Sequence, residues 1–551
     1  MIQRVSDMTP TLDMAHDRGT GPVRSQRPIY FDLLPPCNHA CPAGEDIQAW
    51  LALAQAGHYH EAWQTLIRAN PLPAVHGRVC YHPCESNCNR TELDSAVSIH
   101  AVERFLGDLA LSKGWKPLID NAKSGKKILV IGAGPSGLSA AYHLARLGHS
   151  VEIHEAGPTP GGMMHFGIPA YRLPRLELLA ETARIEAMGV QFIFNHKVED
   201  VLKEKNQGEF DAVFVAIGAH ISKKVAIPAR DAAKVMDALS LLRSAESAEK
   251  PLLGRRVVVY GGGNTAMDAA RTAKRLGASD TLIIYRRDRE HMPAHSFEAD
   301  EALAEGVKIK WLSTIRELSG TDIHVEKMQL DENGQAHATG EFETLQADAV
   351  VLALGQEADS SFLKSIPGIE IMQDGNVKVD GTMMTGHPGI FGGGDMISNE
   401  RTVTHAVGHG RRAAEHINAW LNGTHYQETA QPPLVSFNML HLPVFDDAES
   451  SKQTERAAAV RTDDFNEITA GLSEQQARYE AQRCLSCGNC YECDNCYAAC
   501  PETAVIKLGV GLRYQFDYAK CTGCSACFEQ CPCHAIEMIA EPVSTALKTK
   551  V

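Results

Sequence analysis

The sequence predicts a multidomain protein that combines α/β and α+β folds. Two observations carry this prediction: two glycine-rich segments that each lie between a predicted strand and a predicted helix, and sixteen cysteines confined to the two ends of the chain. At 551 residues the chain is several times longer than a typical domain. Hydrophobic residues make up 44% of it and charged residues 22%, as in ordinary globular proteins.

Charge and hydropathy argue against two classes of protein. A net charge of −15 does not suit a nucleic-acid-binding face. No apolar run approaches the roughly 20 residues that span a bilayer, and the polar first thirty residues do not have the pattern of a secretory signal. We therefore expect a cytoplasmic protein with no nucleic-acid partner and no membrane span, whose cysteines serve metal binding or catalysis instead of disulfides.

The middle of the chain contains no cysteine. Five cysteines lie between Cys37 and Cys88, and the other eleven lie between Cys484 and Cys533. Flavin disulfide reductases need a redox-active cysteine pair beside the flavin. The gap therefore excludes that class of enzyme.

The first glycine-rich segment is a complete dinucleotide-binding fingerprint, with a strand, a turn of three glycines, a helix, a second strand and a terminal acid. These parts are the strand 126–130, Gly132, Gly134 and Gly137, the helix 138–147, the strand 150–154 and Glu155. The glycines permit the tight turn, the approach of the backbone to a pyrophosphate, and close packing of helix on strand. The amino end of the helix attracts phosphate, and Glu155 can accept hydrogen bonds from a ribose.

A second fingerprint follows the strand 257–260. Its turn and the start of its helix contain Gly261, Gly263, Asn264, Thr265 and Ala266. Its next strand, 281–285, ends in Arg286 and Arg287, where the first copy ends in an acid. An acid would repel a 2′-phosphate, whereas a guanidinium binds it bidentately. The second site therefore predicts NADPH and the first predicts FAD; NADH stays open, because two arginines at a strand end can also be merely solvated.

Later segments predict how the two domains are connected. The segment 211–218 is a buried strand that ends in glycine, a pattern repeated at 349–355, and 389–395 is a strand followed by a glycine turn and an acid. The second fingerprint lies between the segments that return to the first domain. The nucleotide-binding domain is therefore predicted to be inserted into the FAD-binding domain.

This arrangement resembles the flavoproteins with two dinucleotide-binding domains. The resemblance implies that Asp395, after Gly394, binds the flavin ribityl chain, and that the helix beginning at about Thr402 points its amino end at the isoalloxazine. A helix cap is the alternative role of Asp395. The predicted FAD-binding residues are Gly132, Gly134, Pro135, Ser136, Gly137, Glu155, Gly162, Gly394, Asp395 and Thr402.

Longer motifs make a closer match. They are the run Gly-Gly-Met-Met-His-Phe-Gly-Ile-Pro-Ala-Tyr-Arg-Leu-Pro at 161–174, Tyr285-Arg-Arg, Met292-Pro293, and the cysteine-rich segment before the FAD turn. Over roughly residues 36–490 the chain resembles the glutamate synthase small subunit and its relatives, including the electron-input half of dihydropyrimidine dehydrogenase. This implies hydride transfer from NADPH to FAD and single-electron transfer into clusters. The resemblance also implies that Gly167, Ile168 and Pro169 lie beside the flavin. Because the flavin itself exchanges hydride and single electrons, no side-chain acid or base is obligatory, and we name no catalytic residue.

The carboxy-terminal cysteines have the spacing of a bacterial two-cluster ferredoxin. Two Cys-x2-Cys-x2-Cys-x3-Cys-Pro runs follow one another, and in this pattern the fourth cysteine of each run ligates the other cluster. One 4Fe–4S cluster would take Cys490, Cys493, Cys496 and Cys531, and the other Cys521, Cys524, Cys527 and Cys500. Structural zinc also suits Cys-x2-Cys, but two tandem runs that each close with Cys-Pro disfavour it.

The five amino-terminal cysteines cannot fill two clusters by themselves. In the resembled family this domain carries two clusters, one with a non-cysteine ligand. By position, Cys41, Cys80 and Cys84 would share a cluster with Glu103, although a glutamate in a helical stretch more often lies on a solvated face.

The second cluster of the resembled family needs a Cys-x2-Cys pair just before Cys37, and residues 21–36 contain no cysteine. The carboxy-terminal run has a surplus pair, Cys484 and Cys487. We hypothesise that this pair folds back and joins Cys37 and Cys88. Four clusters then use every cysteine except Cys533; three clusters with an idle Cys484/Cys487 pair is the alternative.

Together these patterns predict an amino-terminal helical iron–sulfur domain, two Rossmann-like domains, and a carboxy-terminal ferredoxin-like domain. The expected boundaries are a tail 1–35, the helical domain 36–120, the FAD domain 121–225 and 360–425, the NAD(P)H domain 226–359, a linker strap 426–480, the ferredoxin-like domain 481–540 and a tail 541–551, with residues 1–30 and 541–551 mobile.

The predicted function is electron transfer between NAD(P)H and 4Fe–4S clusters through FAD. The expected partner in a hetero-oligomer is a 2-oxoacid, aldehyde or formate oxidoreductase, or a ferredoxin. A self-sufficient reductase of a small substrate, a non-catalytic scaffold and a flavin-bifurcating subunit are the alternatives, and the direction of electron flow stays open.

Overall fold

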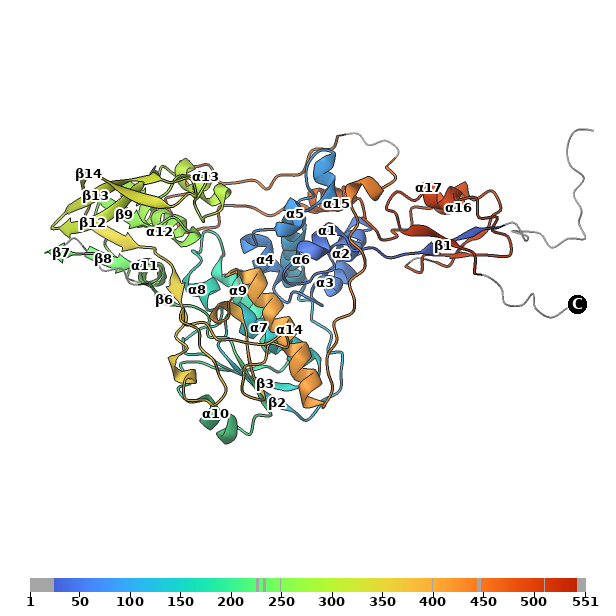
Figure 1. The fold of residues 1–551 in the computed structure, drawn as a ribbon, viewed down its shortest axis with the longest axis horizontal. Helices are drawn as coiled ribbons and strands as arrows, with labels where there is room; N and C mark the ends of the chain where they lie inside the picture. The colour runs from blue at the N-terminus through green and yellow to red at the C-terminus, as the bar shows by residue number, and fades with distance from the viewer. Residues whose placement is uncertain are drawn as a thin grey trace, which may run out of the picture.

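The computed structural model describes residues 24–223, 227–230, 234–247, 249–398, 400–442, 447–509 and 511–542. A helical unit and two α/β units form the body of the molecule, and a smaller unit extends from it on the side opposite the second α/β unit (Figure 1). The predicted mobility of residues 1–23 and 543–551 lies outside the described residues. Of the helices in the described ranges, none has both the length and the apolar character needed to cross a membrane.

The helical unit lies at the centre of the body (Figure 1). Its helices are α1 (Pro36–Ala40), α2 (Ile47–Gln55), α3 (Tyr59–Leu66), α4 (Pro73–Val79), α5 (Pro83–Ser86) and α6 (Ile99–Lys113). Helices α2 and α3 are separated by a turn at 56–58. Cys41 and Cys80 are the C-caps of α1 and α4, and α4 packs against α6, the helix that contains Glu103.

Helices α4 and α6 approach each other closely at Gly107. A Cβ on Gly107 would lie 2.3 Å from the Ala74 nitrogen and 2.6 Å from its Cα. We expect Gly107→Ala to lower the free energy of unfolding by about 1–3 kcal/mol or more, because backbone must shift to admit the methyl group. Thermal unfolding of the purified chain measures the effect, and loss of amide-exchange protection in α4 and α6 localises it. Gly381→Ala, at a position with nothing within 4 Å, is the control; equal unfolding temperatures for both variants would contradict the prediction.

The first α/β unit is a five-stranded parallel sheet in the order β17-β5-β2-β3-β4. The strands are β2 (Lys127–Ile131), β3 (Ser150–His154), β4 (Gln191–Ile193), β5 (Ala212–Val215) and β17 (Ile390–Gly392). Helices α7 (Pro135–Arg146) and α14 (Val403–Leu421) pack against each other beside it. Strands β2 and β5 are apolar and almost fully buried, as expected for a parallel sheet covered on both faces.

The second α/β unit has its own parallel sheet in the order β11-β10-β9-β15-β8. These strands are β8 (Lys234–Asp237), β9 (Arg256–Tyr260), β10 (Asp280–Ile284), β11 (Lys308–Lys310) and β15 (Ala349–Leu352). The unit also contains α11 (Ala238–Ala245), α12 (Asn264–Arg275) and α13 (Ser296–Ala304). A second sheet, which no motif in the sequence predicted, contains β12 (Ser313–Ser319), β13 (Asp322–Leu330) and β14 (Ala336–Gln346) as antiparallel neighbours, and β7 (Ala229–Arg230) pairs parallel with β12.

The second unit is inserted into the first, which confirms the predicted insertion. Strand β17 returns to the first sheet only after the whole second sheet is complete. The two connections pair as short antiparallel strands, β6 (Ile221–Ser222) and β16 (Gln356–Glu357). Both crossings between the units therefore pass through one narrow two-stranded link.

The small unit at the end of the molecule is built from both ends of the chain. It contains α16 (Asn495–Ala499), β18 (Val505–Lys507), β19 (Tyr514–Phe516), α17 (Ala526–Glu529) and β20 (Ile536–Ala540). Strand β1 (Gln26–Tyr30) pairs antiparallel with β20. The Tyr30 ring packs on Phe516 with centroids 5.2 Å apart, and Arg24 pairs with Glu541 at 2.6 Å.

The predicted tail 1–35 is therefore wrong for residues 24–35, and so is the boundary at 541. The error has a physical reason. An open edge of a strand such as β20 favours pairing with another strand, and the segment that pairs with it comes from the far end of the sequence.

The predicted strap crosses the body before the small unit begins. Apart from a single 3-10 turn at 437–439, its described part before α15 (Glu474–Gln482) contains no helix. Glu467 accepts a hydrogen bond from Arg78 at 2.8 Å, and the Ile468 N–H donates to the Tyr171 carbonyl at 3.0 Å. The strap thus contacts the helical unit and the first α/β unit.

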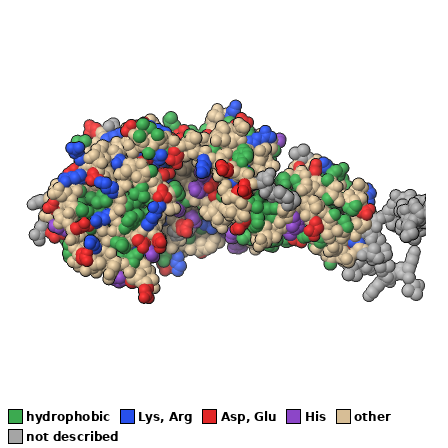
Figure 2. Space-filling model, turned by 90° about the horizontal axis from the view of Figure 1, so that it is seen from above, with side chains coloured by type: hydrophobic (Ala, Val, Ile, Leu, Met, Phe, Trp, Pro, Cys, Tyr) green, Lys and Arg blue, Asp and Glu red, His purple; other side chains and the backbone are tan. Residues whose placement is uncertain are grey.

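On one face of the molecule, acidic and basic side chains are mixed (Figure 2). Figure 2 shows Asp and Glu side chains interspersed with Lys and Arg over the face that it presents. Ion pairs such as Arg289–Asp300 and Lys327–Glu341 bring opposite charges together in the second α/β unit. Such exposed pairs contribute little to stability individually.

Candidate cofactor and cluster sites

The turn between β2 and α7 is shaped to admit a ligand at the amino end of α7. A Cβ on Gly137 would lie 1.9 Å from the Gly132 carbonyl oxygen, whereas Gly134 has nothing within 4 Å of an added Cβ. Ser136, in the first turn of α7, is buried, and within the described part of the chain its Oγ has no hydrogen-bond partner. An open glycine, an unpartnered hydroxyl and a helix amino end together fit the pyrophosphate of a dinucleotide.

Glu155 and Gly162 complete this turn. Glu155 follows β3, and its carboxylate accepts hydrogen bonds from the Ala133 and Gly157 N–H groups, each at 2.7 Å. Gly162 has φ of +53°, and a Cβ there would lie 2.9 Å from the Gly134 Cα. The predicted residues of the first fingerprint therefore lie together around Gly134.

Gly394, the residue before Asp395, lies against Ser136 of this turn. A Cβ on Gly394 would lie 3.1 Å from the Ser136 Cβ. Burial raises the pKa of the Asp395 carboxyl to about 6, and the nearby Arg401 guanidinium opposes that shift. Thr402 is the N-cap of α14 and its side chain forms the cap hydrogen bond, so Asp395 does not cap this helix.

Arg175 fixes the backbone of the loop that is predicted to lie beside the flavin. The loop follows α8 (Met163–Phe166), and the Gly167 N–H donates to the Met163 carbonyl at 2.8 Å. Arg175 donates to the Ile168 carbonyl at 2.7 Å and pairs with Glu246 at 2.8 Å. Pro169 continues the loop toward Tyr171. The loop thus has a fixed backbone without a side-chain acid or base of its own.

The turn between β9 and α12 repeats the pattern in the second α/β unit. A Cβ on Gly262 would lie 2.4 Å from the Tyr285 ring, whereas one on Gly263 would have nothing within 4 Å. Helix α12 starts at the next residue, and Thr265 and Ala266 follow in its first turn. This open glycine at a helix amino end fits a second pyrophosphate.

The two arginines after β10 differ in their surroundings. Arg286 is exposed, and no carboxylate among the described residues pairs with it. Arg287 donates from Nε to the Tyr285 hydroxyl at 2.9 Å. Asn264 at the turn donates to the Tyr81 hydroxyl of the helical unit at 2.7 Å. Arg286 is therefore the guanidinium with its donors available for a phosphate.

The ferredoxin-type cysteines form two groups in the crossed pattern that the spacing predicts. One cavity is lined by Cys500, Cys521, Cys524 and Cys527, so the fourth cysteine of the first run lies with the second run. In the other group, burial and then the thiols of Cys490, Cys531 and Cys493 raise the pKa of Cys496 to about 12. The unassigned Cys533 is buried and its Sγ lies 3.8 Å from that of Cys531.

In the helical unit, Cys41, Cys80, Cys84 and Glu103 lie together. Burial and then the Glu103 carboxylate raise the pKa of Cys80 to about 12, and the thiols of Cys80 and Cys41 add to the raised pKa of Cys84. Glu103 is only 5% exposed and accepts a hydrogen bond from Asn70 at 2.6 Å. The alternative of a solvated helix face for Glu103 is therefore wrong.

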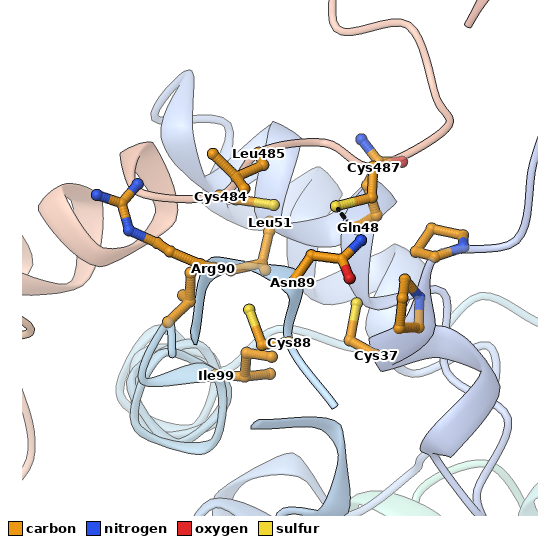
Figure 3. Close-up of a pocket in the computed structure, with 13 residues that line it drawn as sticks. Cys37, Gln48, Leu51, Cys88, Asn89, Arg90, Ile99, Cys484, Leu485 and Cys487 are labelled. Atoms are coloured by element: carbon orange, nitrogen blue, oxygen red, sulfur yellow. Dashed lines mark hydrogen bonds between the residues drawn. The ribbon is translucent and has the colours of Figure 1, made fainter. Parts of the chain in front are cut away.

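Cys37, Cys88, Cys484 and Cys487 line one cavity, although they come from the two ends of the sequence. Figure 3 shows their sulfur atoms turned toward a common space, Cys484 and Cys487 on one side and Cys37 and Cys88 opposite. Burial raises the pKa of Cys37, and the neighbouring thiols of Cys484, Cys88 and Cys487 raise it further. Four thiolates packed this closely repel one another. All four cysteines can therefore be deprotonated only around a bound cation.

Four residues at these sites were not found from the sequence: Glu45 and His76, which lie beside the predicted Glu103, and Asn89 and Thr404. Glu45, His76 and Glu103 have ligand atoms within 4.8 Å of one another. Asn89 donates to Cys487 Sγ at 3.5 Å, and Thr404 donates to Cys80 Sγ at 3.1 Å. Glu45 has a weak signal in its place four residues after Cys41; Asn89 and Thr404 have none, because their partners are distant in sequence.

Known protein families match the three parts of the chain. Residues 126–410 match the pyridine nucleotide-disulphide oxidoreductase family, residues 27–115 the 4Fe–4S cluster domain II of dihydropyrimidine dehydrogenase, and residues 514–537 the 4Fe–4S binding domain. Because residues 126–410 contain no cysteine, the disulphide chemistry in the first family's name has no redox pair there.

Several curated proteins are similar over most of the chain. The NADP(+)-dependent formate dehydrogenase subunit beta of Moorella thermoacetica is 36% identical, over 86% of this chain and 74% of the relative. The NADPH-Fe(3+) oxidoreductase subunit beta of Geobacter sulfurreducens is 32% identical, over 82% and 75%. The glutamate synthase (NADPH) small chain of Escherichia coli is 34% identical, over 70% and 89%.

These relatives are NADPH-linked oxidoreductases or subunits of them, and the FAD, nucleotide and 4Fe–4S modules of this chain have their counterparts in the matched families. The predicted cofactors FAD, NADPH and 4Fe–4S clusters are thereby confirmed. The chain belongs to the family of the glutamate synthase small chain, as an electron-transfer flavoprotein subunit that connects NAD(P)H through FAD to 4Fe–4S clusters.

Proposed function

We propose that the chain holds four 4Fe–4S clusters in series and passes electrons between NADPH and a partner oxidoreductase. The observation that carries the proposal is the cavity lined by Cys37, Cys88, Cys484 and Cys487. With this cavity, every cysteine except Cys533 belongs to a four-ligand set. FAD, when bound, exchanges hydride with a nicotinamide and single electrons with clusters.

Short stretches of the chain connect each ligand set to the next. Cys37 and Cys41 lie at the two ends of α1, so the split set and the Glu103 set share that helix. Cys487 and Cys490 are three residues apart, so the split set also adjoins the ferredoxin unit. The ligand sets therefore extend from the helical unit into the ferredoxin unit, which lies at the far end of the molecule (Figure 1).

We assign the nucleotide sites to the residues that surround the two open glycines. The FAD site is built from Gly132, Gly134, Pro135, Ser136, Gly137, Glu155, Gly162, Gly394, Asp395 and Thr402, with Gly167, Ile168 and Pro169 beside the ring. The NADPH site is built from Gly261, Gly263, Asn264, Thr265, Ala266, Arg286 and Arg287. These residues bind and orient, and the flavin chemistry needs no side-chain acid or base from them.

We propose a partner subunit of the formate, aldehyde or 2-oxoacid oxidoreductase type, or a ferredoxin, in the cytoplasm. Support comes from the printed names of the relatives, several of which are subunits of larger enzymes. The ferredoxin unit supports it as well, because this unit, which contains α16 and α17, lies at the end of the molecule away from the nucleotide-binding unit (Figure 1), and its Cys524 is exposed. A partner that docks there could exchange electrons with the last cluster.

An anaerobic titration with NADPH tests the proposal. We expect the flavin absorbance to bleach, the electron paramagnetic resonance signals of reduced clusters to appear, and iron and sulfide to be present at about four of each per cluster. The same protein without nucleotide is the control. Zinc in place of iron and sulfide, or a flavin that stays oxidised under excess NADPH and NADH, would overturn the proposal.

A further inference from the structure

The Thr404 side chain connects the helix at the FAD site to a cysteine of the helical unit. Thr404 lies in the first turn of α14, is 4% exposed, and donates from Oγ1 to Cys80 Sγ at 3.1 Å. The two residues are 324 positions apart in the sequence. This hydrogen bond therefore connects the first α/β unit to the helical unit, between which the described residues form no strand pairing.

Two hydrogen-bond donors and a helix amino end favour negative charge on Cys80 Sγ. The sulfur accepts a second hydrogen bond from the His82 N–H at 3.3 Å. The amino end of α14, a helix of 19 residues, carries a partial positive charge within one turn of the sulfur. Opposing these, Glu103 and burial disfavour the thiolate and raise the pKa of the thiol.

Hydrogen bonds to cluster sulfurs and local charge set the reduction potential of a cluster. Reduction adds one negative charge to the cluster and its ligand sulfurs. A donor aimed at a ligand sulfur therefore stabilises the reduced state more than the oxidised state. Of the two donors to Cys80, only Thr404 belongs to the side chain of another unit and can be removed without changing the backbone.

We propose that the Thr404 hydroxyl raises the midpoint potential of the cluster that Cys80 ligates. Thr404 acts on the cluster through Cys80 and is a positioning residue. This inference rests on the proposed ligation of that cluster by Cys41, Cys80, Cys84 and Glu103. Through this contact between α14 and Cys80, the flavin-binding unit would set the reduction potential of the cluster that Cys80 ligates.

Redox titration of the holo-protein, followed by the resonance signal of each cluster, tests the proposal. In Thr404→Val, which keeps the shape and loses the hydroxyl, we expect the ratio of reduced to oxidised Cys80 cluster at a fixed potential to fall about tenfold, equal to about 59 mV for a one-electron couple. Thr404→Ser keeps the donor and should restore the wild-type ratio. Thr281→Val, which changes a buried threonine in β10 of the second α/β unit, should leave it unchanged.

Two outcomes would overturn the proposal: a Val variant with full iron and an unshifted midpoint, or a Ser variant shifted as far as Val. If the Val variant loses iron, Thr404→Ala and Thr404→Ser are compared instead. The proposal then requires a lower midpoint potential of the Cys80 cluster in the Ala variant than in the Ser variant. Failure of the ligand assignment has a different signature. In that case Cys80→Ala would retain all the iron, whatever the Thr404 variants show.

Discussion

Replacing Cys484 and Cys487 together by alanine is expected to remove about a quarter of the iron and sulfide from the purified protein, the content of one of four clusters. The reason is the cavity that these two residues line with Cys37 and Cys88. Without the pair, two thiolates cannot hold a cluster that needs four ligands. Iron and sulfide analysis of anaerobically purified protein measures the loss.

The opposite pair supplies a matched variant. Cys37→Ala with Cys88→Ala should remove the same cluster and the same resonance signal, since both pairs contribute to one site. Cys533→Ala is the control, because Cys533 belongs to none of the proposed ligand sets. Full iron content after loss of Cys484 and Cys487 would leave three clusters and an idle pair, and would contradict the split site.

Replacing Arg286 by alanine is expected to weaken use of NADPH by about 10- to 100-fold while use of NADH stays nearly constant. A hydrogen-bonded ion pair with a phosphate contributes about 1.5–3 kcal/mol, and each 1.4 kcal/mol is a factor of ten. NADH lacks the 2′-phosphate and therefore loses nothing. The ratio of kcat/KM for the two nucleotides, measured with an artificial electron acceptor, reports the effect.

The neighbouring residues make this prediction selective. Arg289→Ala is the control, because Arg289 is also exposed in this loop but pairs with Asp300 at 2.6 Å. Arg287→Ala should have a smaller effect than Arg286→Ala, since one donor of Arg287 is already bound to the Tyr285 hydroxyl. Equal losses with NADPH and NADH would show that Arg286 serves the shared part of the nucleotide, and the prediction would be wrong.

Many of the functional residues could be predicted because they lie close together in short segments of the sequence. The fingerprints at Gly132 and Gly261 each lie within one strand–turn–helix unit, so their residues are neighbours in sequence and in space. The cysteine runs from Cys490 and Cys521 are equally local, and their spacing predicts even the crossed arrangement. The antiparallel strands β12, β13 and β14 were not predicted, because no such motif marks them in the sequence.

Prediction was weakest where distant segments meet. The pairing of β1 with β20 overturned the expected tail, since nothing near Gln26 identifies its partner strand. Glu103 could be assigned to a site only by resemblance, because its helix pattern fits a solvated face as well as a buried one. Its burial follows from the packing of α6 on α4, which depends on Gly107 and Ala74.

By itself the sequence determined that this protein has two dinucleotide sites and enough cysteines for several clusters, because glycine turns and cysteine spacings are local and their geometry follows from the backbone. The tertiary structure alone decided which thiols share a cavity from opposite ends of the chain, and that Thr404 reaches Cys80. Those contacts result from the packing of separate units against one another. This packing buries together side chains that are far apart in the sequence, and no local pattern identifies such partners.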